Sequence, residues 1–271
     1  EVVADIFGKP HTIKHRIAPK SFVDSLGNNW LEEVTTEGLF VRTPISLYDE
    51  GQYVVYYEAI FDRPNNSEDM AKLMISAKIT DLADSISKWF NAIIDSKNNV
   101  WWVQEALLSS KTDAFIDVLD VASLSVELWD GSKWVNQCKI TAGFHLLEEY
   151  VIPLDLSIVQ GEPDVIKVRL RSGAALFEID QVSIDFSEDE IDEVHKLEID
   201  QALFNGMVDV SQTIEEFNDN KRVKLQKGDH IDLYYNTPEI KEGNERGFMV
   251  EFKGYFTIGL ESKENPIVDS R

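Results

Sequence analysis

The sequence predicts a mainly β protein: an antiparallel β-sandwich with one or two short helices and a second, small β region. Two neighbouring runs, residues 165–171 and 177–186, carry this prediction, because apolar and polar side chains alternate in each with the period of two that a half-buried strand requires. The phase of the second run slips at Gln181, as it does where a β-bulge inserts one residue. Ser172 and Gly173 offer turn chemistry between the runs, so we expect two antiparallel strands that form a hairpin across the core.

Residues 1–37 are expected to form an extension ahead of the sandwich. They hold the densest basic patch of the chain, and His11 and His15 within it stand four residues apart, a spacing that places two metal ligands on one face of a helix. Pro10 and Pro19 bracket this patch, and no carboxylate is spaced to complete a metal site. The composition therefore favours a surface extension over a metal site.

The following segments alternate between strand and helix signals. Runs of β-branched and aromatic residues predict strands over residues 38–47, 52–61 and 71–80. Apolar residues at helical spacing behind Asp81, a residue that can cap a helix, predict a helix over 81–95. Residues 100–121 carry mixed signals that fit a strand or a helix.

A hairpin is predicted over residues 122–140, because the Asp130-Gly131 pair stands between two alternating runs. Residues 145–157 indicate one more strand, ended by Pro153. An acidic run at 187–194 marks a boundary, since closely spaced like charges repel and stay solvated. Shorter strands are expected beyond it, at residues 195–204, 222–226, 230–236 and 246–260.

The predicted organisation therefore has three parts, and 271 residues with 43% apolar content suffice for a sizeable core. The first part is the N-terminal extension, residues 1–37. The second is the β-sandwich, residues 38–190, with a helical insertion near 81–95. The third is a small C-terminal β region, residues 191–271, which we expect to pack on the sandwich.

Charge and cysteine content narrow the classes of function. A net charge of −23 repels phosphate backbones and anionic lipid surfaces, so we expect no nucleic-acid partner. No run of about 18 apolar residues occurs, so no membrane insertion is expected.

The single cysteine, Cys138, excludes an intrachain disulfide and fits a small core residue better than a reactive thiol. A chain that opens without Met agrees with a removed signal peptide and an extracytoplasmic location, and the unpaired cysteine leaves the cytoplasm open as the alternative.

Catalytic motifs are missing from the sequence. It contains no G-x-S-x-G, H-E-x-x-H or C-x-x-C pattern and no glycine-rich phosphate loop. Glu178 and Asp180 could form the carboxylate pair of a glycoside hydrolase, because residues two apart on a strand share one face. The favoured alternative places them on the solvent face, balanced by Arg169 and Arg171 across the hairpin.

Calcium is the only cofactor that the sequence suggests. Asp180, Asp185 and Glu188 concentrate hard oxygen ligands near the acidic run, but no EF-hand spacing is present, and a solvated linker is the favoured explanation of the run.

Four tryptophans are candidates for ligand contact. Trp101 and Trp102 are adjacent, so on a strand one is buried and the other is exposed. Trp129 and Trp134 flank the Asp130-Gly131 turn, where core packing competes with a binding role.

Four segments together resemble the galactose-binding-like jelly-roll modules: LSVELWDGSKWVNQCKI, LDLS, IKVRLRS and FEIDQVSIDFSE. A last segment, ERGFMVEFKGYFTI, resembles the end of an uncharacterised group of bacterial extracytoplasmic proteins. The resemblance covers roughly residues 120–260. It implies a sandwich of eight to ten strands that binds carbohydrate or assists another domain, although no full set of sugar-contact residues maps onto this chain.

The function expected from the sequence is that of a non-catalytic, extracytoplasmic β-sandwich module that binds a glycan or a protein partner. Two alternatives stay open. One is a glycoside hydrolase that uses a carboxylate pair, and the other is a structural subunit of a cell-surface assembly that pairs through an exposed strand edge.

Overall fold

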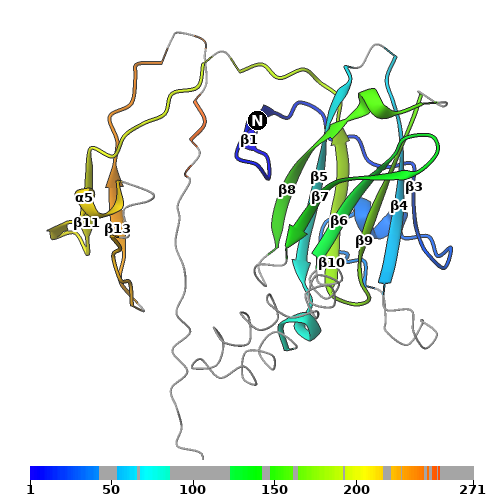
Figure 1. The fold of residues 1–271 in the computed structure, drawn as a ribbon, viewed down its shortest axis with the longest axis horizontal. Coiled ribbons are helices and arrows are strands. Elements are labelled where there is room, and N and C mark those ends of the chain that lie inside the picture. Colours follow the sequence, from blue (N-terminus) through cyan, green and yellow to red (C-terminus); the bar gives the residue numbers. More distant parts are fainter. Residues whose placement is uncertain are drawn as a thin grey trace, which may run out of the picture. The chain divides into compact units, whose positions relative to one another are not determined.

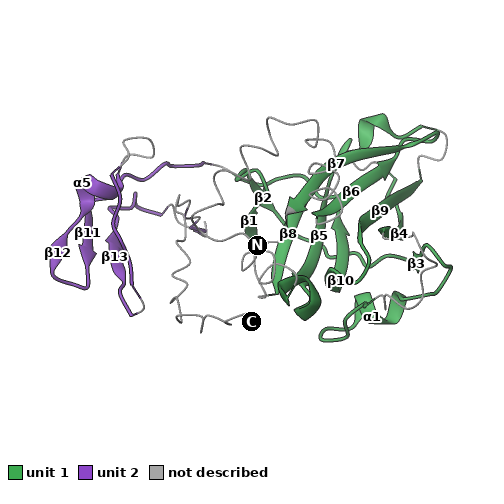
Figure 2. Ribbon diagram, turned by 60° about the horizontal axis from the view of Figure 1, so that its bottom comes forward, with its two compact units in different colours: residues 1–192 green, residues 193–271 purple. Residues whose placement is uncertain are grey.

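The computed structural model describes residues 1–42, 54–65, 68–85, 123–141, 147–160, 164–191, 193–215, 221–226, 228–240, 243, 246–248 and 250. The chain divides into two compact units, Glu1–Asp192 and Glu193–Arg271, coloured green and purple in Figure 2. The division falls within the acidic run 187–194 and two residues after the predicted domain limit at residue 190.

Unit 1 contains two antiparallel sheets that share one core (Figure 1). The five-stranded sheet has the order β3 (Ser21–Asp24), β4 (Val54–Asp62), β9 (Val165–Gly173), β6 (Ser123–Trp129), β7 (Trp134–Thr141). The three-stranded sheet has the order β10 (Phe177–Asp185), β5 (Met70–Ile79), β8 (Glu148–Asp155). The predicted fold class, a mainly β antiparallel sandwich, is confirmed.

Alternating side chains build the interior as the sequence predicts. Ile166, Val168 and Leu170 on β9 are fully buried, and Ile179 and Ile184 on β10 reach the same core from the opposite sheet. Burying such side chains stabilises the fold by about 1.5–3 kcal/mol each.

The hairpin predicted for the two central strands is wrong. β9 pairs with β4 and β6, whereas β10 pairs with β5, so the two consecutive strands lie in opposite sheets. Residues 174–176 carry the chain from one layer to the other. Alternation identifies a strand and its inner face but does not identify its partner, which explains the error. The bulge predicted at Gln181 is confirmed, because the register of β10 against β5 shifts between Ile179 and Gln181.

Residues 1–37 are part of unit 1 and not the surface extension that the sequence predicts. β3 is an edge strand of the five-stranded sheet, and α1 (Leu31–Thr35) inserts Val34 into the core. The β1–β2 hairpin (Val2–Ala4 and Pro10–Thr12) precedes them, and His11 lies on β2. Since His11 is in a strand, the four-residue spacing to His15 does not place the two rings on one helix face.

The helix predicted over 81–95 is only partly within the described residues. Residues 81–85 are helical, and the Ala83 N–H donates to the Thr80 hydroxyl (3.1 Å), so Thr80 rather than Asp81 caps the first turn. Residues 86–122 lie outside the described residues, and with them Trp101 and Trp102. A short 3₁₀ turn, η2 (Leu156–Ile158), follows β8.

Unit 2 holds a three-stranded antiparallel sheet of the order β12 (Val208–Asp209), β11 (Gln201–Phe204), β13 (Ile231–Tyr234), with the short helix α5 (Ser211–Ile214) beside it. The strand predicted at 230–236 corresponds to β13, and only the end of the run 195–204 forms a strand. Residues 222–226 are not a strand, because alternation alone does not supply a pairing partner. None of the helices in the described part of the chain has the length and apolar character needed to cross a membrane.

Candidate functional site

The outer face of the five-stranded sheet gathers aromatic and charged side chains from four neighbouring strands. One row across it contains Glu58, Arg169, Glu127 and Asn136, each directly opposite the next in the register. Side chains in such positions contact one another across the strands. The row therefore alternates in charge, with a guanidinium between two carboxylates.

Arg169 is the centre of this face. Its Nε donates to Oε2 of Glu127 at 2.6 Å, which fixes the plane of the guanidinium. Its Cζ lies 5.2 Å from the ring centroid of Tyr56 and 4.5 Å from that of Trp134. The cation therefore stacks against two rings and holds both in place, as cation–π attraction favours.

Trp129 and Trp134, two of the four predicted tryptophans, meet at the end of the same face. Their ring centroids are 5.3 Å apart and the ring planes are tilted by 59°. Both side chains are half-buried. The predicted hairpin is confirmed, since β6 pairs with β7 and Trp129 is directly opposite Trp134. The pair thus forms an ordered aromatic corner rather than core packing.

The turn between the two tryptophans is rigid. Oδ1 of Asp130 accepts N–H bonds from Ser132 (2.7 Å) and Lys133 (2.8 Å), and these bonds hold the pKa of the Asp130 carboxyl below its ordinary value. Gly131 has a φ of +106°, and a Cβ there would meet the Gln160 carbonyl oxygen at 2.4 Å. This close approach requires glycine and fixes where the aromatic corner lies.

A second row of the face contains Tyr56, Arg171, Ser125 and Lys139. Arg171 is half-buried, and among the described residues it forms no hydrogen bond or ion pair. Glu58, in the first row, likewise has no ion pair within the described part of the chain. Within the described ranges, the guanidinium of Arg171 and the carboxylate of Glu58 are thus two charged groups of this face that form no ion pair.

Two of the three calcium candidates, Asp180 and Asp185, are engaged in hydrogen bonds within the protein. Oδ1 of Asp180 accepts the N–H of Gly38 (2.7 Å), and Oδ2 of Asp185 accepts the N–H groups of Lys14 (2.6 Å) and His15 (3.2 Å). Glu188 is exposed. In the residues that the structure describes, no group of three or more His, Cys, Asp or Glu side chains is placed to hold a metal ion.

The solvent face predicted for Glu178 and Asp180 is wrong. Their exposed fractions are 7% and 2%, because residues 36–42 lie against this part of β10 and Val41 forms a β-bridge with Ile179. Glu178 forms ion pairs with Arg42 (3.0 Å) and Lys78 (3.2 Å), and not with Arg169 or Arg171. Both carboxylates are thus engaged beneath other segments, and the pair lacks the open position that glycoside hydrolysis requires.

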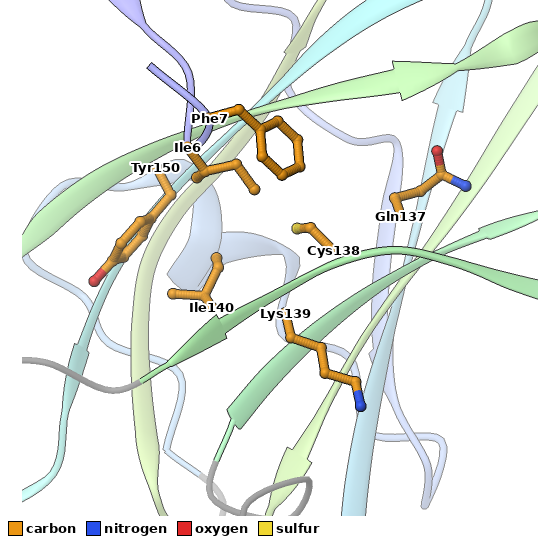
Figure 3. A pocket seen from close by; sticks show the side chains of 7 residues that line it. All are labelled: Ile6, Phe7, Gln137, Cys138, Lys139, Ile140 and Tyr150. Atoms are coloured by element: carbon orange, nitrogen blue, oxygen red, sulfur yellow. The ribbon is translucent and has the colours of Figure 1, made fainter. Parts of the chain in front are cut away.

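A pocket of about 390 Å³ lies beside the edge strands β7 and β8, one from each sheet (Figure 3). Phe7 and Cys138 point into it, whereas Lys139 points away. Burial raises the pKa of the Cys138 thiol to about 12, so the thiolate is scarce near neutral pH. This agrees with the predicted role of Cys138 as a small core residue. The pocket is lined by Ile6, Phe7, Gln137, Cys138, Lys139, Ile140 and Tyr150.

A buried polar network joins the N-terminal hairpin to the end of β10. The fully buried ring of His11 lies between two carboxylates, with Nε2 3.0 Å from Asp5 Oδ2 and Nδ1 2.8 Å from Asp189 Oδ2. Oδ1 of Asp189 accepts the Thr12 N–H (2.8 Å), and Lys72 Nζ lies 3.5 Å from the same oxygen. Burial by itself would raise the pKa of Asp189, but these donors hold it below its ordinary value.

Comparison with known proteins identifies no relative: no family model, curated protein or solved structure matches this chain. The resemblance to galactose-binding-like modules therefore stays a prediction. Sequence reasoning located Trp129 and Trp134 but missed Tyr56 and the site role of Arg169. The only local signal for this face was the alternation of basic with apolar residues along 167–171. The other strands of the face come from distant segments of the sequence.

Proposed function

We propose that this protein is a non-catalytic binding module that holds a glycan on the outer face of the five-stranded sheet. The observation that carries the proposal is the stack of Tyr56, Arg169 and Trp134, with Trp129 beside it. These side chains are held in place by one another before any ligand arrives, which lowers the entropy lost on binding.

The chemistry of the face suits a sugar. The apolar face of a pyranose ring packs against an aromatic ring, and Trp129 and Trp134 supply rigid rings of this kind. Sugar hydroxyls need donors and acceptors in the same plane, and Glu58, Asn136 and Arg171 lie on the same face. A few convergent polar groups beside an apolar platform are typical of carbohydrate contact.

An extracytoplasmic location is part of the proposal. The single cysteine does not oppose it, since a buried thiol whose pKa is raised to about 12 resists oxidation.

The test is a glycan array probed with the native protein and with Trp134→Ala and Trp129→Ala. We expect each substitution to weaken binding about tenfold or more, which corresponds to about 1.4 kcal/mol. Phe7→Ala is the matched control, because Phe7 is 70% exposed and lies outside the aromatic corner. Circular dichroism checks that the variants are folded. The absence of binding to any glycan, or an equal loss in Phe7→Ala, would contradict the proposal.

A second candidate function is strand addition by a protein partner. β7 is an edge of the five-stranded sheet and, within the described residues, pairs only with β6. An unpaired edge of eight residues can accept an extended segment. The Asp130 N–H donates to the Lys133 carbonyl, so alternation along the ladder directs the N–H of Asn136 away from β6, and Asn136→Pro would remove this donor from the edge and should abolish such pairing. Loss of complex formation in this variant, with glycan binding absent in the native protein, would favour this candidate.

A further inference from the structure

The candidate face differs in charge from the rest of the molecule. The protein carries a net charge of −23, yet the described residues of this face on β4, β9, β6 and β7, apart from Asp62, include four cations and two carboxylates. At the neighbouring end of the sheet, Lys20 and Asp62 pair with each other and leave this balance unchanged. The cations are Lys139, Lys167, Arg169 and Arg171, and the carboxylates are Glu58 and Glu127.

Arg171 differs from Arg169 in its surroundings. Arg169 is paired with Glu127 and lies against the rings of Tyr56 and Trp134, so its guanidinium is engaged in contacts within the protein. Arg171 stands two residues further along β9, directly opposite the uncharged Tyr56 and Ser125. Within the described residues its guanidinium has no acceptor. A half-buried guanidinium that lies opposite Tyr56 and has no acceptor among the described residues is placed to bind an external anion.

We propose that Arg171 binds a carboxylate of the ligand, so that the glycan is one that contains uronic acid residues. This inference rests on the proposed function of the same face. The planar guanidinium and a carboxylate form two parallel N–H···O bonds, and such bidentate pairs are roughly twice as strong as neutral hydrogen bonds. Among the residues that the structure describes, no carboxylate pairs with Arg171, so its donors remain available to a ligand there.

The same residues disfavour other polyanions. A nucleic acid carries a phosphate at every nucleotide, and a protein of net charge −23 repels such a density of negative charge. Glu58 lies opposite Arg169, one step across the face from Arg171, and has no ion pair among the described residues. A carboxylate in that position accepts sugar hydroxyls but repels a second anion. An acidic sugar offers both a separate carboxylate and hydroxyls, and therefore fits both side chains.

The experiment compares matched neutral, uronate-containing and sulfated oligosaccharides, with oligothymidylate and polyglutamate as further probes, by titration calorimetry at 50 and 200 mM salt. We expect the uronate-containing oligosaccharides to bind best and to lose affinity at the higher salt concentration. Arg171→Gln should weaken their binding about tenfold or more. Arg171→Lys should have a smaller effect, because lysine keeps the positive charge but cannot form two parallel hydrogen bonds to one carboxylate. Lys20→Gln is the control, since it removes a cation from the end of the same sheet.

The outcomes separate this inference from the proposed function. Equal binding of neutral and uronate-containing oligosaccharides, unchanged by Arg171→Gln, would overturn the inference and leave glycan binding intact. Binding confined to sulfated oligosaccharides, oligothymidylate or polyglutamate would overturn the assignment of a uronate. If Trp134→Ala abolishes all sugar binding while Arg171→Gln abolishes only the preference for uronate, both proposals are supported.

Discussion

Buried aspartates in unit 1 act mainly as acceptors for backbone N–H groups. Oδ1 of Asp5 accepts from Phe7 and Lys9, and Asp24 and Asp185 bind several N–H groups in the same way. Because a charged acceptor roughly doubles the strength of a hydrogen bond, each of these carboxylates fixes a turn. The acidic residues thus have a structural role that the composition alone, a net charge of −23, does not reveal.

Asp24 provides a test of this role through pH. The residue is 3% exposed, and its carboxylate accepts N–H bonds from Leu26, Asn28 and Trp30. Burial by itself would raise its pKa, but the hydrogen bonds hold it below the ordinary value of 3.8. A depressed folded-state pKa means that the stabilisation is complete above about pH 4 and is lost as the pH falls through the lower folded-state value.

We therefore expect Asp24→Asn to cost about 2–3 kcal/mol in the free energy of unfolding at pH 7, with a smaller difference at pH 2.5. Urea denaturation followed by tryptophan fluorescence measures both values. Asp62→Asn is the control, since Asp62 forms an exposed pair with Lys20 and should contribute at most about 1 kcal/mol. A pH-independent cost for Asp24→Asn would contradict this role.

Alanine substitutions at Gly131 and Gly8 distinguish the cost of backbone strain from the cost of a steric clash. Both glycines have positive φ, but a Cβ at Gly131 would meet the Gln160 carbonyl oxygen at 2.4 Å, whereas a Cβ at Gly8 meets nothing within 4 Å. Gly8→Ala should cost about 1 kcal/mol from backbone strain alone, and Gly131→Ala should cost clearly more. Thermal unfolding of the two variants measures the difference. Equal costs would mean that the turn shifts to accommodate the methyl group.

At the scale of elements, the β1–β2 hairpin is fastened to the segment after β10 by His11. Both ring nitrogens face carboxylate oxygens, so both contacts are attractive only when the ring carries two protons. The neighbouring bonds strengthen the junction, since the Thr12 N–H donates to Asp189 and the Glu190 N–H donates to the Thr12 hydroxyl. The ring of His11 is thus the buried centre of a set of bonds that hold the hairpin.

His11→Ala should destabilise unit 1 by about 3 kcal/mol, because it leaves Oδ2 of the buried Asp5 carboxylate without its hydrogen-bond partner. We also expect faster amide hydrogen exchange at Thr12 and Glu190 than in the native protein. His15→Ala is the matched control, as His15 is exposed and four residues away. The role assigned to His11 would be refuted if both variants exchanged at the native rate.

Individual strands were predictable from the sequence, whereas their partners were not. Residues 166–170 and 182–186 alternate clearly, so their inner faces follow from the sequence, as does the Gln181 bulge. The pairing of β9 with β4 joins residues more than 100 positions apart, and no local pattern encodes it. β3 escaped prediction because it is only four residues long.

The candidate site shows the same limit at the scale of the whole molecule. Trp129 and Trp134 were identified because they flank a local turn, and the structure brings them together. Tyr56 and Arg171 were not identified as site residues, since their positions on the face depend on the order of four strands. Sequence patterns can identify candidate site residues within one hairpin. Identifying the residues of a surface formed by distant strands requires knowledge of the strand order.

The two units differ greatly in their cores. Every residue of the main buried cluster lies between Phe22 and Phe186, whereas Ala202 is the only buried apolar residue that the structure describes in unit 2. Apolar burial supplies most of the stability of a fold, so unit 1 has the means to fold by itself and unit 2 has few. Residues 193–196, at the start of unit 2, are exposed and outside any strand or helix, which also favours independent folding of the two units.

We therefore expect a chain of residues 1–191 to unfold cooperatively, at the same temperature as the main transition of the full protein. Residues 193–271 alone should show no sharp transition, since a region with so little buried apolar surface is marginal. Calorimetry of both chains measures this, and limited trypsin digestion of the full protein should cut first near the exposed Lys196 and spare the buried Lys72. If residues 1–191 failed to fold, unit 2 would have to stabilise the sandwich, and binding at the candidate face would then have to be tested in the full chain.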